Sequence, residues 1–217
     1  MGQLFNLDSP LMQGLGKLGD LIILNLLALV CSLPIVTLGA SAAALYYAME
    51  GLREEKGHLV LSFFRAFKTN FKQATVQWLI LLVLGVVLAV SLVFYLQFEM
   101  SMGRLLLGLV ILLAVVWCMT ASWTFPLQAK FSNTISGTLR NALLCALAYL
   151  PRSLVMSVLN LLPIALFMFF PYWFFRLGIL WIFIWYALSA FLILKLLKKP
   201  YTVLMKTSQD GEAPEQE

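Results

Sequence analysis

The sequence contains few charged residues. Only 12% are Asp, Glu, Lys or Arg, about half the share of an average soluble domain, whereas 62% are hydrophobic. A soluble chain of 217 residues could not hide this much apolar surface from water, but a lipid-facing helix can be apolar on every side. The composition therefore predicts a single transmembrane domain over residues 1–206. The last residues, 207–217, contain Gly, Pro and four acids and are expected to form a disordered cytoplasmic tail.

The sequence also lacks the residues from which enzyme and metal sites are usually built. It has one histidine and three cysteines, which lie in apolar segments without metal-ligand spacing. It has no GxxxxGK[ST], HExxH or GxSxG motif. We therefore expect no enzyme activity, no catalytic residues, no metal and no cofactor.

The net charge of +5 does not predict a nucleic-acid partner. The basic residues lie between apolar runs rather than along one solvent-exposed stripe. Anionic lipid head groups are the expected counter-charge.

Long apolar runs are what the sequence does contain. A spanning helix needs about 20 predominantly apolar residues. The first such run, from Leu21 to Met49, includes Pro34 and is interpreted as one span with a kink. The predicted fold class is therefore an all-α membrane protein, a bundle of about five transmembrane helices. The other four predicted spans are Ala74–Phe98, Leu105–Ala129, Ser153–Phe175 and Leu177–Leu194.

The distribution of Lys and Arg predicts the orientation of these spans. If the spans alternate, twelve of the fifteen basic residues lie on one side, within 53–72, 130–152 and 195–206. The other side holds Lys17, Arg104 and Arg176. Because cytoplasmic connections carry the excess of basic residues, the count predicts a cytoplasmic C-terminus and an outside N-terminus.

Small residues recur at every fourth position after the expected kink. Ala40, Ala44 and Ala48 follow this spacing, as do Gly39 and Ala43. Such a face lets another helix pack closely. The helix propensity of alanine is the alternative explanation.

Amphipathic helices are expected between spans 1 and 2, at Leu59–Gln73, and between spans 3 and 4, at Gly137–Leu150. In the first, at about 100° per residue, phenylalanines share one arc and basic residues the adjacent flank. This pattern is typical of a helix at an anionic lipid surface, the favoured interpretation, or of a docking surface for a cytoplasmic partner. The candidate residues are Phe63, Phe64, Arg65, Phe67, Lys68, Asn70, Phe71 and Lys72.

Polar residues are rare inside the predicted spans. Ion-coupled transporters usually place ionisable side chains there, and these interiors have none. Asp20 lies at the edge of the first span, three residues after Lys17, and is interpreted as part of a boundary pair. Asn25, Gln128 and Asn160 are expected to hydrogen-bond between helices, with contact to a solute as the alternative.

Two stretches carry a resemblance to a known family. The run Gly19-Asp20-Leu21-Ile22, Leu24-Asn25 and Cys31 to Gly39 resembles the N-terminal signature of the YesL family of bacterial integral membrane proteins. The run Phe63-Phe64, Phe67-Lys68 and Asn70 to Gln73 resembles its second signature. The resemblance extends over about residues 5 to 205.

The resemblance implies a multi-pass protein of the plasma membrane of a Gram-positive bacterium. Function in that family is unknown, and its genes tend to lie beside carbohydrate importers of the ABC type. The resemblance therefore implies an accessory subunit in sugar uptake or its regulation, with the importer's permease or ATPase subunits as partners. A small transporter or channel for a neutral solute such as a sugar is the alternative, using Asn25, Gln128 and Asn160 with Trp123 and Trp181.

Overall fold

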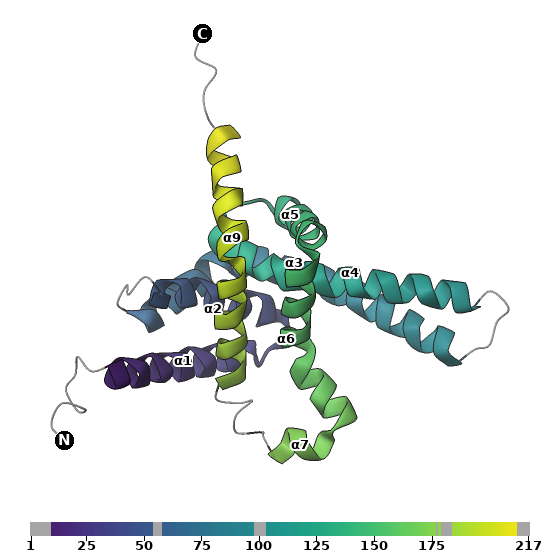
Figure 1. Ribbon diagram of the computed structural model, residues 1–217, viewed down its shortest axis with the longest axis horizontal. Coiled ribbons are helices and arrows are strands. Elements are labelled where there is room, and N and C mark those ends of the chain that lie inside the picture. Colours follow the sequence, from purple (N-terminus) through teal and green to yellow (C-terminus); the bar gives the residue numbers. More distant parts are fainter. Residues whose placement is uncertain (1–9, 54–57, 98–102, 177, 179–183, 212–217) are drawn as a thin grey trace, which may run out of the picture.

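The computed structural model describes residues 10–53, 58–97, 103–176, 178 and 184–211 (Figure 1). Within this part of the chain every regular element is helical. Four segments are long and apolar enough to cross a membrane: Ile35–Leu52, Leu59–Gln97, Gly103–Lys130 and Leu150–Phe169. The chain therefore has the helices of a membrane protein. The elements are α1 (Pro10–Ser32), the 3₁₀ helix η1 (Ile35–Thr37), α2 (Leu38–Arg53), α3 (Leu59–Gln97), α4 (Gly103–Lys130), α5 (Ile135–Ala148), α6 (Leu150–Phe169), α7 (Pro171–Arg176) and α9 (Tyr186–Gly211).

The first predicted span is two helices rather than one bent helix. Pro34 is extended, with φ −75° and ψ 116°, and η1 follows it before α2 begins. The Ser41 hydroxyl on α2 donates to the carbonyl of Ala28 on α1 over 2.7 Å. Leu21 of α1 and Leu52 of α2 line one cavity, so the two helices pair as a hairpin. The proline therefore marks a reversal of the chain instead of a kink.

This reversal alters the alternation on which the orientation was predicted. Lys17, assigned by the count to the sparse side, lines the same cavity as Lys130 and Lys198, assigned to the rich side. The count treated Leu21 to Met49 as a single crossing, whereas the chain returns after Pro34. In the structure Lys17 therefore lies with the basic group that the count had placed opposite it.

The small-residue face of α2 packs closely, as the four-residue spacing predicted. Ala40, Ala43, Ala44 and Ala48 are fully buried. A Cβ atom added to Gly39 would overlap the carbonyl oxygen of Ala74 on α3. The absence of a side chain at this position lets the two backbones approach one another.

The helix α3 is continuous over 39 residues, from Leu59 to Gln97. The predicted amphipathic helix Leu59–Gln73 and the predicted span Ala74–Phe98 are therefore parts of one helix, apart from Phe98, which lies outside the described residues. At 1.5 Å per residue α3 is about 58 Å long, roughly twice the hydrocarbon thickness of a bilayer. Its basic end therefore extends well beyond the apolar part.

The outer halves of α3 and α4 form a hairpin that projects from the rest of the molecule (Figure 1). Gly85 leaves room there for the indole of Trp117, whose Nε1 donates to the carbonyl of Leu81 over 2.9 Å. The outer apolar side chains are exposed, as at Val83, Val90, Leu96, Leu105 and Leu112. In lipid such a surface needs no further protein cover.

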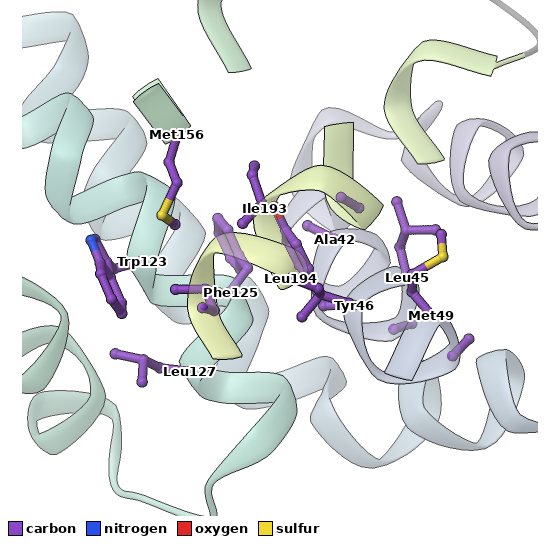
Figure 2. Packing of buried hydrophobic residues seen from close by; sticks show 14 of the residues in the cluster. Ala42, Leu45, Tyr46, Met49, Trp123, Phe125, Leu127, Met156, Ile193 and Leu194 are labelled. Carbon is purple, nitrogen blue, oxygen red and sulfur yellow. The ribbon is translucent and has the colours of Figure 1, made fainter. Parts of the chain in front are cut away.

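The core lies where α2, α4, α6 and α9 meet (Figure 2). Trp123, Met156 and Ile193 are fully buried there, together with Leu45 and Met49 of α2. In Figure 1, α6 and α9 run across the direction of α3 and α4. The described helices therefore cross one another instead of sharing one axis.

Several predicted boundaries differ in the structure or cannot be compared. A separate helix, α5, covers most of the segment predicted between spans 3 and 4. Of the fifth predicted span, Leu177–Leu194, residues 177 and 179–183 lie outside the described ranges, and α9 covers the predicted span from Tyr186 onward. The helix α9 continues to Gly211, so the predicted tail begins in helical conformation, and residues 212–217 lie outside the described part.

Gly39→Ala should destabilise the protein by about 1–3 kcal/mol, because the added methyl group overlaps the backbone of α3. Thermal unfolding in detergent, followed by circular dichroism, measures the change. Gly108→Ala is the matched control, since a Cβ atom there meets nothing within 4 Å. Equal melting temperatures for both variants would contradict the close packing of α2 on α3.

Candidate functional site

The basic end of α3 presents an exposed surface of aromatic and cationic side chains, which we call the basic-aromatic face. At about 100° per residue its members fall within an arc of about 120°. All five are exposed, so two rings and three positive charges share one accessible side of the helix. The basic-aromatic face consists of Phe64, Arg65, Lys68, Phe71 and Lys72.

Other residues of the predicted surface point into the protein. Phe63 is fully buried, and its ring stacks on Phe67, with centroids 6.3 Å apart. Phe67 packs against the buried cluster of Ala40, Ala43 and Ala74. Phe63 and Phe67 therefore pack inside the protein, whereas Phe64 and Phe71 are exposed, and Phe63 is not part of an accessible surface.

Asn70 joins a set of buried amides between three helices. The Gln128 side chain on α4 donates from Nε2 to Asn70 Oδ1 over 3.0 Å. Its Oε1 accepts from Gln77 Nε2 at 3.0 Å and from the Thr138 hydroxyl of α5 at 3.3 Å. Beside them, Gln73 Nε2 donates to the carbonyl of Asn133. These contacts fasten α3 and α5 to the end of α4.

The other predicted interior contacts lie elsewhere in the structure. Asn25 Oδ1 on α1 accepts from the backbone N–H of Ala187 on α9 over 2.8 Å. Asn160 Nδ2 on α6 donates to the Ser122 hydroxyl on α4 over 3.1 Å. Asp20 is half-buried on α1. Asn25, Gln128 and Asn160 therefore stand in three separate helix contacts rather than around one solute.

An aromatic cavity of about 280 Å³ lies beside Asn160. Its lining includes Trp78, Trp117, Phe125 and Tyr46, with Ser122 and Asn160 as polar groups. Trp123, expected to line a solute path, is instead fully buried, and its Nε1 donates to the Ser153 hydroxyl over 2.8 Å. Trp181 lies outside the described residues.

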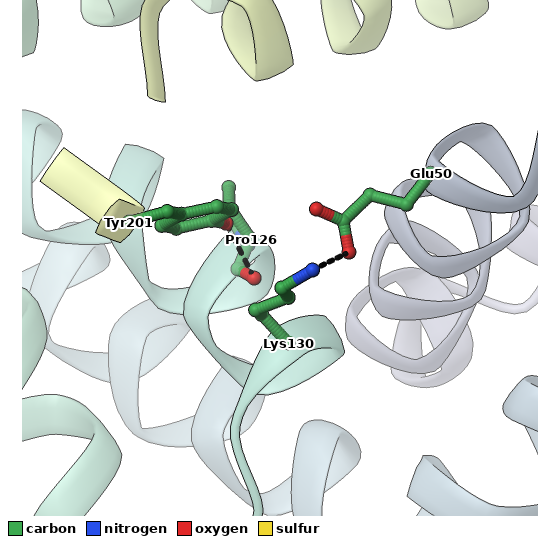
Figure 3. A network of polar contacts seen from close by, with 4 residues as sticks. All are labelled: Glu50, Pro126, Lys130 and Tyr201. Atoms are coloured by element: carbon green, nitrogen blue, oxygen red, sulfur yellow. Dashed lines mark hydrogen bonds and ion pairs between the residues drawn. The ribbon is translucent and has the colours of Figure 1, made fainter. Parts of the chain in front are cut away.

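An ion pair joins the C-terminal ends of α2 and α4 (Figure 3). Lys130 Nζ lies 3.1 Å from Glu50 Oε2, and both side chains are largely buried. Nearby, the Tyr201 hydroxyl on α9 donates to the carbonyl of Pro126 over 2.8 Å. Burial, with the Glu50 carboxylate adding to it, raises the pKa of Tyr201 well above its usual range, so the phenol keeps its proton.

Glu50, Lys130 and Tyr201 were not predicted from the sequence to take part in contacts between helices. A signal for the first two exists, because each directly ends an apolar segment and their charges are opposite. No sequence signal joins Tyr201 to Pro126, since the two are 75 positions apart.

A family model described as "Protein of unknown function, DUF624" matches residues 21–92, less than half of the chain. The matched segment contains the second half of α1, the reversal at Pro34, α2 and the basic-aromatic face. The match supports a relationship to an uncharacterised family, and the finer resemblance to the YesL family stays a prediction. No curated protein and no solved structure matches the chain.

Gln128→Leu should lower stability by about 1–3 kcal/mol, because Asn70, Gln77 and Thr138 all lose a hydrogen-bond partner. Chemical unfolding in mixed micelles measures the loss. Ser91→Ala is the control, since that exposed hydroxyl bonds only the Val87 carbonyl of its own helix and its removal should cost less than about 0.5 kcal/mol. If Gln128→Leu left the free energy of unfolding unchanged, the amides would not be holding α3, α4 and α5 together.

Proposed function

We propose that the protein is a non-enzymatic membrane accessory subunit that binds the permease or ATPase subunits of an ABC-type carbohydrate importer. The importer as partner follows from the resemblance to the YesL family. Binding to another protein, rather than chemistry on a small molecule, is supported by the arrangement of the described residues.

The observation that carries this proposal is the continuity of α3. One helix bears the basic-aromatic face at its N-terminal end and the exposed apolar hairpin surface at its other end. A permease that packs along the hairpin within the bilayer comes within reach of the basic-aromatic face at the membrane surface. Arg, Phe and other aromatic residues are also the types enriched in protein interfaces.

The interior contacts support the same proposal. Asn25, Gln128 and Asn160 all take part in hydrogen bonds between helices. Their amides therefore contribute to holding the fold, which is the common role of such residues in membranes.

The orientation that fits this function has the basic connections and the C-terminus in the cytoplasm of a bacterial plasma membrane. Because Lys17 lines the same cavity as Lys130 and Lys198, the beginning of α1 belongs on that side as well. This placement leaves Arg104 and Arg176 as the basic residues of the outer side.

A photo-crosslinking amino acid at Phe64 or Phe71 should give an adduct with a permease or ATPase subunit in intact cells. Both rings are exposed on the basic-aromatic face. The adduct, identified by mass spectrometry, should disappear when Arg65, Lys68 and Lys72 are all changed to Gln. The same crosslinker at Phe169, which is 77% exposed on α6, is the control. Adducts with lipid alone, or an equal yield of subunit adduct at Phe169, would argue against the accessory role.

A second candidate function, a transporter or channel for a neutral solute, is favoured by the aromatic cavity beside Asn160. Rings can stack on a sugar, and one amide can orient it. Under this alternative, liposomes that contain only this protein take up labelled sugar, and Asn160→Leu abolishes the uptake. If these liposomes take up sugar no faster than empty vesicles do, the transporter function is excluded.

A further inference from the structure

The aromatic cavity beside Asn160 lies halfway along two of the membrane helices. Trp117 and Asn160 line it, and each is near the middle of a helix, α4 or α6, that is long and apolar enough to cross a membrane. Asn160 and Leu161 of α6 are exposed, so the cavity is accessible along that helix. A molecule dissolved in hydrocarbon can therefore reach it from within the bilayer. Three other lining residues, Ala42, Tyr46 and Phe125, are shown in Figure 2.

The lining of the aromatic cavity presents ring faces rather than polar groups. The indole N–H of Trp78 donates to the carbonyl of Ile35 over 2.7 Å, and that of Trp117 to the carbonyl of Leu81 over 2.9 Å. Both N–H groups are therefore used within the protein, and the indoles offer their apolar faces. The ring of Phe125 lies 6.3 Å from that of Trp78. None of the described lining residues is charged, so the cavity suits a flat, uncharged ring.

One hydrogen-bond donor of the lining has no partner. Tyr46 is only 6% exposed, and its hydroxyl takes part in no hydrogen bond among the described residues. A buried tyrosine hydroxyl normally finds a partner, because leaving it unpaired costs free energy. The Ser122 hydroxyl, by contrast, donates to the Cys118 carbonyl over 2.9 Å and accepts from Asn160 Nδ2 over 3.1 Å. Tyr46 is therefore the group that a bound acceptor would satisfy.

The polar capacity of the cavity is small compared with the needs of a sugar. A sugar carries hydroxyls on most of its ring carbons, and each needs partners when it leaves water. The lining offers the hydroxyl of Tyr46 and the remaining capacity of the Asn160 amide. A molecule whose polarity is limited to carbonyl oxygens meets this supply without leaving hydroxyls unpaired.

We propose that the aromatic cavity binds a lipid-soluble quinone, with its ring against the indoles of Trp78 and Trp117 and one carbonyl oxygen accepting from the Tyr46 hydroxyl. A quinone is flat and uncharged, with carbonyl acceptors and no donor, and its electron-poor ring stacks well on electron-rich indoles. An apolar cavity of about 150 Å³ in another protein holds benzene. The aromatic cavity, at about 280 Å³, has room for two fused rings.

The isoprenoid chain of such a quinone would extend past Leu161 into the surrounding hydrocarbon, because that residue is both exposed and part of the lining. This site is independent of the proposed accessory role, which depends on the basic-aromatic face of α3. A quinone bound here would instead contact α2, α3, α4 and α6, and should stabilise the protein.

The test uses the full chain in phosphatidylcholine nanodiscs and follows the quenching of tryptophan fluorescence by a naphthoquinone with a short isoprenoid chain. The unaltered protein should show saturable quenching, because Trp78 and Trp117 line the cavity. Ala121→Leu puts a larger side chain into the cavity and should abolish the saturable part. Tyr46→Phe removes only the hydroxyl and should weaken binding about fivefold to tenfold, the effect of one lost hydrogen bond. Its melting temperature without quinone should not fall, since that hydroxyl has no partner among the described residues.

The matched controls are Ala89→Leu and Tyr172→Phe, at exposed residues that do not line the cavity. Both should bind the quinone as the unaltered protein does. Neither glucose nor the alcohol of the same isoprenoid chain should displace the bound quinone. The proposal is overturned if quenching does not saturate, if Ala121→Leu binds as tightly as Ala89→Leu, or if Tyr46→Phe binds as tightly as Tyr172→Phe. Displacement by glucose would assign the cavity to a sugar instead, and displacement by the alcohol to a hydrocarbon chain.

Discussion

The structure depends on the close contact between α2 and α3. Gly39 leaves no room for a side chain against the backbone of Ala74, and buried alanines extend the contact along α2. Helices in lipid gain little from the hydrophobic effect and associate through close packing, so small residues take the role that large apolar ones have in a soluble core. This contact directs Phe63 and Phe67 inwards and leaves Phe64, Arg65 and Lys68 accessible. The basic-aromatic face is therefore a product of the same packing that holds the core.

Features that depend on local pattern could be predicted from the sequence. The apolar runs predict membrane helices, and the four-residue recurrence from Gly39 to Ala48 predicts the face on which α3 packs. The asparagines and glutamines were expected to join helices, and Asn25, Gln128 and Asn160 do so. In each case the spacing or the residue type alone limits what the side chain can do in an apolar environment.

Features that depend on partners distant in the chain could not be predicted. Pro34 is compatible with a kink and with a reversal, and contacts between α1 and α2, such as that of Ser41 with Ala28, distinguish them. The amphipathic pattern of Leu59–Gln73 identifies an apolar arc. It does not show whether lipid or another helix contacts that arc, because both are equally apolar neighbours. The cavity that Lys17 lines together with Lys130 and Lys198 could not be predicted either, because its lining comes from four helices and the charge count had assigned Lys17 to the opposite side.

Because α3 is one uninterrupted helix, its two ends move together as a rigid body. Its apolar end adjusts its tilt to the thickness of the surrounding hydrocarbon layer, at a cost of only fractions of a kcal/mol per Å of mismatch. Because the described helix has no proline or other break between Leu59 and Gln97, a tilt at that end also moves Arg65 and Lys68 at the other. In a bilayer, a change in the hydrocarbon thickness around the far end of the helix would therefore shift these two cations as well.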